Sequence, residues 1–329
     1  MRNLKAFLAV AFFSASIACF AQDHVRFIVT GDSRWADGHP RPGDENGVNA
    51  VALRSLSKAI LAEKPNVLLL TGDLIWAKTD DEETSQLKTF IDIMKPVYDS
   101  GIKVLTIPGN HDTHAPNADA EWRQAFSGEF ADPDNGPAGG KDLSFYYKTG
   151  NCLFVGIDEF VNGDKGACSV DQAWLDSVLQ KNPATHVFAF AHKLAFFAGH
   201  HDDGFNKEPE VRNTMMQSLS DAGCHMVLFG HDHFYDHELA LKDGWPESRA
   251  IHQVIVGTAG APFVTGAVAA QTPTDGDWKL THLGHDEGAI GYAVVDVVGN
   301  HVSVVYKSEK TPGDFETTDS FSYDQAPNK

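Results

Sequence analysis

The feature that most constrains the fold is a set of five apolar segments that each end in polar residues. They read HVRFIVTGD, NVLLLTGDL, KVLTIPGNHD, HVFAFAHK and HMVLFGHDH, and helical patterns lie between them. Apolar runs of this length, rich in β-branched and aromatic residues, are typical of strands. Because such strands alternate with helices, the sequence predicts sheet strands that are covered on both faces.

Other segments complete a mixed α/β sandwich. SFYYKTGNCLFVGID and GYAVVDVVGNHVSVVYK predict hairpins that turn at Gly150–Asn151 and Gly299–Asn300. Helices are expected from apolar repeats and from a possible capping box; the residues are Val48, Ala52, Leu56 and Ile60, then Val211, Met215 and Leu219, and the box Ser169–Gln172 opening a helix through Trp174 and Val178. Four Gly-, Pro- and Asp-rich stretches are expected to be loops: 35–46, 117–141, 195–209 and 262–288.

The N-terminal stretch MRNLKAFLAVAFFSASIACFA, residues 1–21, is typical of a secretory signal peptide. Its apolar run is shorter than the roughly 20 residues that span a bilayer, so a membrane anchor is disfavoured; a lipid anchor at Cys19 is a weaker alternative. We therefore expect a secreted or periplasmic protein with no membrane span in the mature chain. The expected domain covers residues 22–310, and residues 311–329 are expected to be a polar C-terminal tail.

Charge and cysteine content narrow the function further. The formal net charge is −19, and removal of Arg2 and Lys5 makes it more negative, which argues against binding to a nucleic-acid polymer. Outside the first 21 residues the cysteines are Cys152, Cys168 and Cys224. A Cys152–Cys168 disulfide is possible, Cys224 is expected to be a buried thiol, and no clustered cysteines indicate a structural zinc site.

The polar residues at the predicted strand ends form a candidate metal site. In an open α/β sheet, ligands bind beyond the carboxyl ends of the strands. Those ends carry Asp32, Asp73, Asn110-His111-Asp112, His192 and His231-Asp232-His233. These oxygen and nitrogen donors suit Zn, Mn, Fe or Co and do not suit soft ions.

In this order and spacing the sequence resembles the calcineurin-like metallophosphoesterases, the superfamily that includes the purple acid phosphatases. The blocks GDSR, GDLI, GNHD, AFAH and GHDH stand where that superfamily has GDxH, GDxx, GNH(D/E), a His after a strand, and GHxH. The resemblance implies a four-layer αββα sandwich of mixed sheets with two divalent or mixed-valence transition metal ions.

The same resemblance implies a role for each matching residue. Asp73 would bridge both metals, since two close cations need an anionic ligand between them. Asn110, His192 and His231 would complete the second metal, while Asp32 and His233 would bind the first. His111 would act near the leaving oxygen as general acid or charge stabiliser, with Asp112 orienting its imidazole. Asp112 and Asp232 have an alternative role as loop hydrogen bonders.

Arg34 departs from the family pattern, because it stands where the first block supplies a histidine ligand. A guanidinium has no free lone pair, and Trp76 stands where purple acid phosphatases have a tyrosine ligand. Three interpretations follow: water completes the first metal and Arg34 contacts the substrate, the enzyme uses one metal, or the centre has decayed into a phosphate-binding module. The first is favoured, because a planar fork of donors suits phosphoryl oxygens.

The sequence thus predicts an exported metal-dependent phosphoesterase that hydrolyses a small phosphomonoester or phosphodiester through a metal-bridging hydroxide. The alternative is a non-catalytic phosphate- or nucleotide-binding protein with a degenerate metal centre. Several loop residues are candidates either for the substrate mouth or for ordinary surface: His114, His200, His201, Asp202, His282 and His285.

Overall fold

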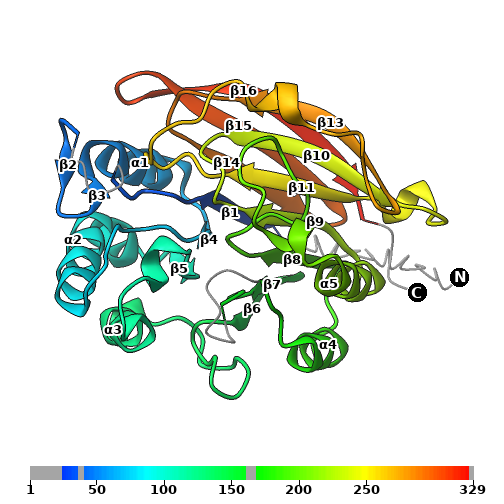
Figure 1. Ribbon diagram of the computed structural model, residues 1–329, viewed down its shortest axis with the longest axis horizontal. Helices are drawn as coiled ribbons and strands as arrows, with labels where there is room; N and C mark the ends of the chain where they lie inside the picture. Colours follow the sequence, from blue (N-terminus) through cyan, green and yellow to red (C-terminus); the bar gives the residue numbers. More distant parts are fainter. Residues whose placement is uncertain (1–23, 36–40, 161–167, 326–329) are drawn as a thin grey trace, which may run out of the picture.

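Two large mixed sheets pack face to face in the computed structural model, which describes residues 24–35, 41–160 and 168–325 (Figure 1). One sheet has the strand order β16-β15-β14-β1-β4-β5. Its strands are β1 His24–Thr30, β4 Val67–Leu70, β5 Lys103–Thr106, β14 Gly291–Val298, β15 His301–Thr311 and β16 Asp314–Asp324. Strands β1, β4 and β5 are parallel, whereas β14, β15 and β16 join them through antiparallel pairs.

The second sheet has the order β12-β13-β10-β11-β9-β8-β7-β6. Its strands are β6 Phe145–Thr149, β7 Cys152–Gly156, β8 His186–Phe190, β9 Cys224–Phe229, β10 Tyr235–Lys242, β11 Ile251–Val256, β12 Thr274–Asp275 and β13 Trp278–Asp286. The central strands β7, β8, β9 and β11 are parallel. A separate two-stranded sheet pairs β2 Asp44–Glu45 with β3 Val48–Asn49.

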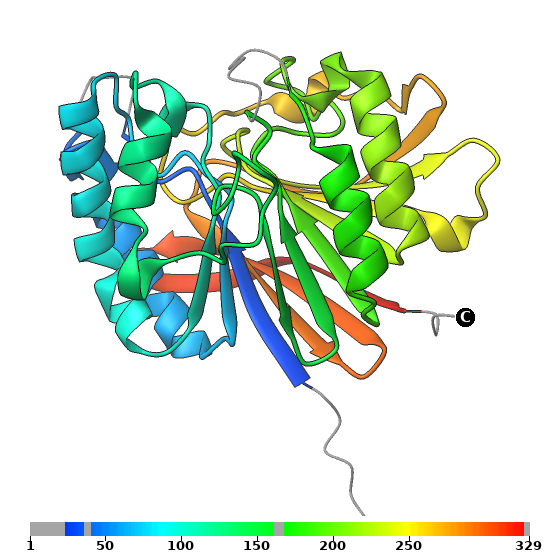
Figure 2. The same ribbon diagram turned by 90° about the horizontal axis from the view of Figure 1, so that it is seen from below.

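Helices cover the outer faces of both sheets. The first group is α1 Ala50–Glu63, α2 Asp80–Asp99 and α3 Ala118–Ala125, and the second is α4 Gln172–Lys181 and α5 Pro209–Asp221. Figures 1 and 2 show the two groups on opposite sides of the sandwich. One apolar core lies between the sheets and another lies under each helical layer. The predicted four-layer sandwich of mixed sheets is therefore confirmed.

Local signals in the sequence place most of these elements. The hairpins β6–β7 and β14–β15 turn at Gly150–Asn151 and Gly299–Asn300, as predicted. Helix α1 begins after Asn49, whose side chain accepts a hydrogen bond from the Ala52 N–H, so Val48 precedes the helix but is still buried.

The start of α4 differs from the predicted capping box. Helix α4 is capped by Asp171, whose carboxylate accepts from the Trp174 N–H at 2.9 Å. The Ser169 hydroxyl instead donates to the Glu159 carbonyl oxygen at 3.2 Å. A side chain that hydrogen-bonds to a distant backbone carbonyl does not cap the helix that follows it.

Three of the expected loops contain a whole α-helix or strand, beginning with β2 within 35–46, and so does the expected tail. Helix α3 lies within 117–141, and β12 and β13 lie within 262–288. In the expected polar tail, β16 pairs antiparallel with β15. Only two residues of β13 and none of β16 are buried, so these strands lack the apolar pattern that revealed the buried strands.

The suggested disulfide is not formed, because Cys152 and Cys168 lie on opposite faces of the eight-stranded sheet. Cys152 packs in the core between the sheets, whereas Cys168 packs in the core beneath α4 and α5. Neighbouring residues of a strand point to opposite faces, and Leu153 accordingly joins the Cys168 side. Cys224 is a buried thiol, as predicted.

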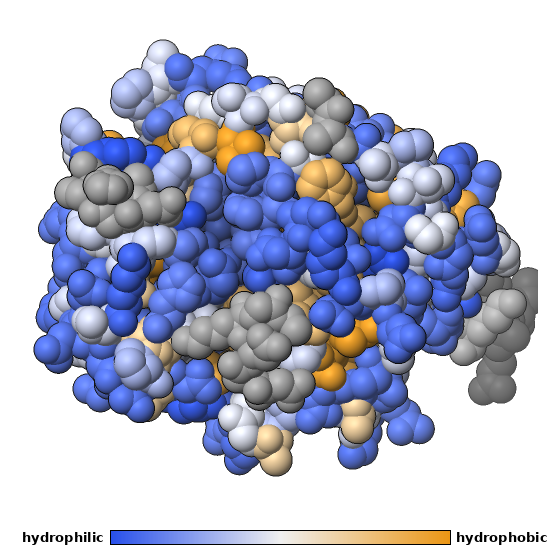
Figure 3. Space-filling model, in the orientation of Figure 1, coloured by the Kyte–Doolittle hydropathy of each residue, from blue (hydrophilic) through white to orange (hydrophobic). Residues whose placement is uncertain are grey.

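The expected signal peptide and the lipid-anchor position Cys19 lie outside the described residues. In the described part of the chain, no helix combines the length and apolar character needed to cross a membrane. The face seen in Figure 3 is largely hydrophilic, with scattered hydrophobic areas.

Candidate metal centre

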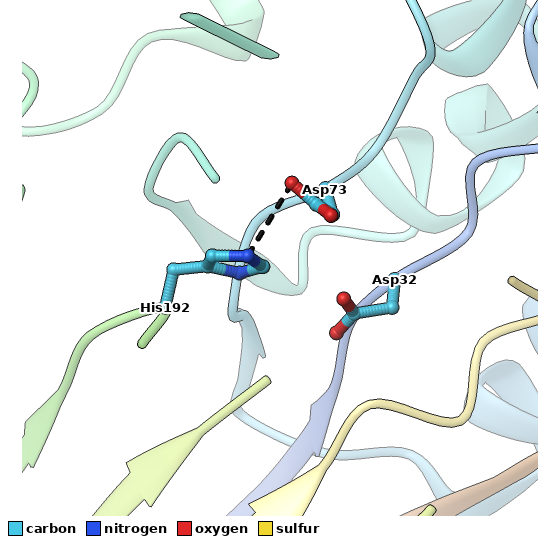
Figure 4. A group of neighbouring side chains, drawn as sticks. All are labelled: Asp32, Asp73 and His192. Atoms are coloured by element: carbon cyan, nitrogen blue, oxygen red, sulfur yellow. Dashed lines mark ion pairs between the residues drawn. The ribbon is translucent and has the colours of Figure 1, made fainter. Parts of the chain in front are cut away.

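The predicted metal ligands all follow the ends of strands and converge where the two sheets meet. They are Asp32 after β1, Asp73 after β4, Asn110 after β5, His192 after β8, and His231 and His233 after β9. Figure 4 shows Asp32, Asp73 and His192 gathered at one place, and one ligand atom from each lies within 4.8 Å of the others. All three are buried, with exposures of 1% or less.

The backbone is strained at three of these residues. Asp32, Asp73 and His231 have φ values of 64°, 51° and 68°, in the left-handed region that side-chain-bearing residues rarely adopt. Such strain persists where the surroundings fix it, and it clusters at functional sites. The chain turns sharply at these residues, just after the strands end, and the turns direct the three side chains into the site.

A glycine next to the ligands is explained by close packing. A Cβ atom on Gly109 would lie 2.3 Å from Asp73 Oδ1 and 2.9 Å from His192 Cε1. Only glycine therefore fits before Asn110, which accounts for the first position of the GNHD block.

Hydrogen bonds to the backbone fix the orientation of two imidazoles. His192 Nδ1 donates to the Thr71 carbonyl at 2.8 Å, and His233 Nδ1 donates to the Pro262 carbonyl at 2.7 Å. Because a carbonyl only accepts, Nδ1 carries the proton in both rings and Nε2 keeps a lone pair. His233 Nε2 is buried without a hydrogen-bond partner among the described residues and lies 3.6 Å from Asp32 Oδ1.

Four acceptor atoms consequently face one another. His192 Nε2 lies 3.0 Å from Asn110 Oδ1, 3.3 Å from Asp73 Oδ1 and 3.2 Å from His231 Nδ1. His231 Nε2 pairs with Asp203 Oδ1 at 2.8 Å, which places the ring proton there and leaves a lone pair on Nδ1. Lone pairs repel at these distances unless a cation lies between them, so this donor set fits a metal ion.

The pKa shifts of the histidines agree with such a site. Burial lowers the pKa of His231 to about 3, and burial together with Arg34 lowers the pKa of His233 well below its usual value. Both imidazoles are therefore neutral at neutral pH, which is the form that binds metals. The pKa of Asp73 is also low, because His192, His111 and Arg34 outweigh the opposing effect of burial.

Arg34 lies beside the expected bridging carboxylate. Its Nε donates to Asp73 Oδ2 at 3.2 Å, and its Nη1 donates to the Trp35 carbonyl at 3.1 Å. The guanidinium also lies 5.3 Å from the centre of the Trp76 ring, and Arg34 is only 5% exposed. The permanent positive charge of Arg34 is therefore buried beside Asp73, within the group of expected ligands.

His111 and Asp112 take different positions relative to this centre. His111 Nε2 lies 3.8 Å from Asp73 Oδ2, and its ring packs against Trp76 with centroids 4.2 Å apart. The Asp112 carboxylate accepts from the backbone N–H groups of Leu74, Ile75 and Gly109 at 2.8–3.3 Å. Asp112 therefore ties the loop after β4 to the loop after β5, as in the alternative role considered for it, and does not orient the His111 imidazole.

Sequence reasoning missed two carboxylates that hold the histidines. Besides His231, Asp203 contacts Lys193 Nζ at 2.9 Å. Buried Glu159 accepts from the backbone N–H groups of Lys193 and His192 at 2.7 and 3.3 Å. Neither belongs to a recognisable motif, since Asp203 lies in an expected loop and Glu159 stands three residues after Gly156, the last residue of β7.

Asp232 and one loop histidine lie at the edge of the centre. Asp232 Oδ1 accepts from both the backbone N–H and the imidazole Nδ1 of His201, at 3.0 and 2.7 Å. The His201 ring packs on His231 with centroids 4.1 Å apart. His201 thus lines the mouth of the site, whereas His282 and His285 lie elsewhere and contact Asp236.

Comparisons with known proteins agree with this geometry. The model of the calcineurin-like phosphoesterase family matches residues 25–235. The rat (Rattus norvegicus) serine/threonine-protein phosphatase CPPED1 is 26% identical over an alignment of 214 residues that covers 60% of this chain and 64% of the relative. The chain therefore spans a little under two thirds of that curated relative.

Solved structures share the fold. The purple acid phosphatase PPD1 from yellow lupin (Lupinus luteus) has a TM-score of 0.65 at 17% identity, covering 92% of this chain and 54% of the lupin chain. A dimetal phosphatase from Danio rerio has a TM-score of 0.57 at 13% identity, covering 92% of this chain and 99% of the other. At these identities the likeness concerns the fold alone.

Proposed function

This chain belongs to the calcineurin-like phosphoesterase family, and on that premise we propose that it is a metal-dependent phosphoesterase acting on a small phosphomonoester or phosphodiester. The observation that carries the proposal is the convergence of acceptor atoms from Asp73, Asn110, His192 and His231. This donor set needs a cation. Zn, Mn, Fe and Co are the ions whose preferences it meets.

Asp73, Asn110, His192 and His231 would hold one ion, and Asp32, Asp73 and His233 the other. When bound, the ions supply positive charge to the phosphoryl oxygens and lower the pKa of water toward neutrality. For the first ion we favour water as the remaining ligand. The single-metal enzyme and the non-catalytic phosphate-binding module are the competing interpretations.

Arg34 would position both the carboxylate and the substrate. A guanidinium is a planar fork of N–H groups, which suits phosphoryl oxygens as well as the Asp73 carboxylate that Arg34 contacts. Its charge favours the ionised form of Asp73 and would also stabilise charge that develops on the phosphoryl group.

His111 would stabilise the leaving oxygen by a hydrogen bond. Burial lowers the pKa of His111 to about 3, so its imidazole is neutral and carries one N–H near neutral pH. Its Nδ1 is buried without a hydrogen-bond partner among the described residues, and its ring is held against Trp76. A neutral donor in a fixed position fits a charge stabiliser better than an imidazolium acid.

Metal analysis coupled to turnover tests the proposal. The protein should bind about two equivalents of metal and hydrolyse nitrophenyl phosphate or bis(nitrophenyl) phosphate, with activity lost on chelation and restored by metal. Phosphate binding without turnover under any of the four metals would favour the non-catalytic module.

A second candidate function is suggested by the name of the rat relative, a serine/threonine-protein phosphatase. A phosphoserine peptide belongs in the same screen for that reason. Faster hydrolysis of the peptide than of the nitrophenyl esters would indicate a phosphoprotein substrate, and the residues assigned to the metal centre would stay the same.

Export is part of the proposal and rests on residues 1–21. N-terminal sequencing of the protein recovered from its native host tests it. A mature chain beginning near residue 22 is expected, whereas a retained Met1 in the recovered protein would contradict export by this route.

A further inference from the structure

A second group of potential metal ligands lies on β10 and β13, and it shares no residue with the centre described above. One ligand atom from each of Asp236, Glu238 and His282 lies within 4.8 Å of the others. Asp236 and Glu238 are 0% and 1% exposed, while the His282 side chain is 34% exposed. The group thus combines two buried carboxylates with an imidazole that reaches solvent.

A β-bulge brings the histidines to the carboxylates. In the antiparallel pair, Asp236 stands opposite His285 and Glu238 opposite His282, and the register shifts between these pairs so that Leu283 has no partner. Residues three apart on a regular strand point to opposite faces. The extra residue reverses this, so His282 and His285 both approach Asp236, at 3.6 and 2.8 Å.

The hydrogen bonds leave the two carboxylates without charge compensation from lysine or arginine in the described part of the chain. Asp236 Oδ2 accepts from Gln271 Nε2 at 2.8 Å and pairs with His285 Nδ1. Glu238 Oε2 accepts from Gln253 Nε2 at 3.1 Å. Asp236 Oδ1 is buried and receives no hydrogen bond from any described residue, an arrangement that is costly for a buried acceptor.

We propose that Asp236, Glu238 and His282 form an additional mononuclear site for a divalent transition metal ion such as Zn²⁺. A cation would use the orphaned Asp236 oxygen and neutralise the pair of carboxylates. Two carboxylates and one imidazole suit zinc or manganese, and soft ions find no thiolate here. Water would complete the coordination on the open side beside His282.

His285 is a positioning residue in this site. Its Nδ1 contacts Asp236 and its Nε2 lies 3.2 Å from Glu287 Oε2, so the imidazole links a ligand to an outer carboxylate. Partners of this kind orient metal ligands, and their loss weakens binding by about 10- to 100-fold.

The competing explanation requires only protons. Burial and the neighbouring Asp236 raise the pKa of Glu238 to about 8, so a protonated Glu238 beside a cationic His285 would also relieve the repulsion. That arrangement predicts no uptake of metal at these residues. The variants described below would then bind as much Zn²⁺ as the parent.

Zn²⁺ uptake by chelator-treated protein tests the site. The parent, Asp236→Asn, His282→Ala and the control Thr281→Ala, an exposed neighbour on β13, are dialysed against Zn²⁺ and the bound metal is counted. We expect Asp236→Asn and His282→Ala to lose one equivalent while Thr281→Ala keeps it. Their turnover of nitrophenyl phosphate should match the parent.

The reciprocal variant separates the two sites. Asp73→Asn should lose metal from the first centre and retain the equivalent at β10–β13, which the double variant with His282→Ala then loses. The inference does not depend on phosphoesterase activity, since its readout is bound metal. His282 is partly exposed, so His282→Ala should not impair folding. If this substitution leaves the amount of bound Zn²⁺ unchanged both in the parent and in the Asp73→Asn variant, the site does not exist.

Discussion

Arg34 Nε lies 3.2 Å from Asp73 Oδ2, so a buried guanidinium contacts the carboxylate that is expected to bridge two metals. This contact gives a role to the arginine at a position where the family pattern has a histidine ligand. The arginine cannot bind a cation, but it places a permanent positive charge beside the Asp73 carboxylate.

Replacing Arg34 with alanine should reduce turnover more than metal content. If the guanidinium stabilises the phosphoryl group, the rate should fall by about 10²–10³, as for loss of one oxyanion donor. Metal counting and steady-state kinetics measure both quantities, with the exposed Arg54→Ala as a control. Full activity in Arg34→Ala would leave the arginine a purely structural role.

The substitution Arg34→His should tighten metal binding but, like Arg34→Ala, should lower the turnover rate. It supplies a nitrogen ligand to the first ion, so resistance to a chelator should rise, while the phosphoryl contact is lost. Chelator titration followed by turnover distinguishes these effects. A variant that is more active yet no more resistant would contradict the assignment.

Asp73→Asn should lower the metal content and abolish turnover with little change in fold, because Asp73 lies in the loop after β4 and not in an apolar core. An amide lacks the negative charge that a bridge between two cations requires. Circular dichroism checks folding, and the exposed Asp81→Asn in α2 is the control. Near-normal activity would rule out a bridging role.

Asp112→Ala should destabilise the protein even without metal. The change leaves the N–H groups of Leu74, Ile75 and Gly109 without their acceptor. Each buried N–H group that stays unpaired lowers the free energy of unfolding by about 1–3 kcal/mol. A loss on the order of 3 kcal/mol in urea unfolding of the chelator-treated protein is expected. An unchanged midpoint would show that these loops are held together by other contacts.

Glu159 should make stability depend on pH. Burial raises its pKa in the folded state to about 8, above the unfolded value of about 4.3, so the folded state binds more protons between these pH values. Its contribution is therefore fully present below about pH 4 and is lost as the pH rises through about 8. Glu159→Gln should flatten the pH dependence of unfolding by up to about 1.4 kcal/mol per pH unit; an equal slope in both proteins would contradict this.

The sequence alone determined the layers and the donors of the centre. Strands that are buried on both faces appear in the sequence as apolar runs, because both faces exclude polar residues. The residues that follow these runs are candidate ligands, because the carboxyl ends of parallel strands meet at one edge of the sheet. The GNHD block could be recognised from its residues, but the reason for its glycine, whose Cβ atom would collide with Asp73 and His192, is visible only in the structure. Strands β13 and β16 left no such pattern because solvent tolerates their polar residues.

The partners of these residues depend on how the chain packs in three dimensions. The contact of Arg34 with Asp73, the backbone donors around Asp112 and the pairing of Asp203 with His231 join segments separated by many residues. Cys152 and Cys168 were likewise placed on opposite sides of the eight-stranded sheet by the pleat of β7 and by the packing of the segment before α4. Residue type limits what a side chain can donate or accept, but hydrogen bonds form over about 3 Å, and only packing brings distant segments that close.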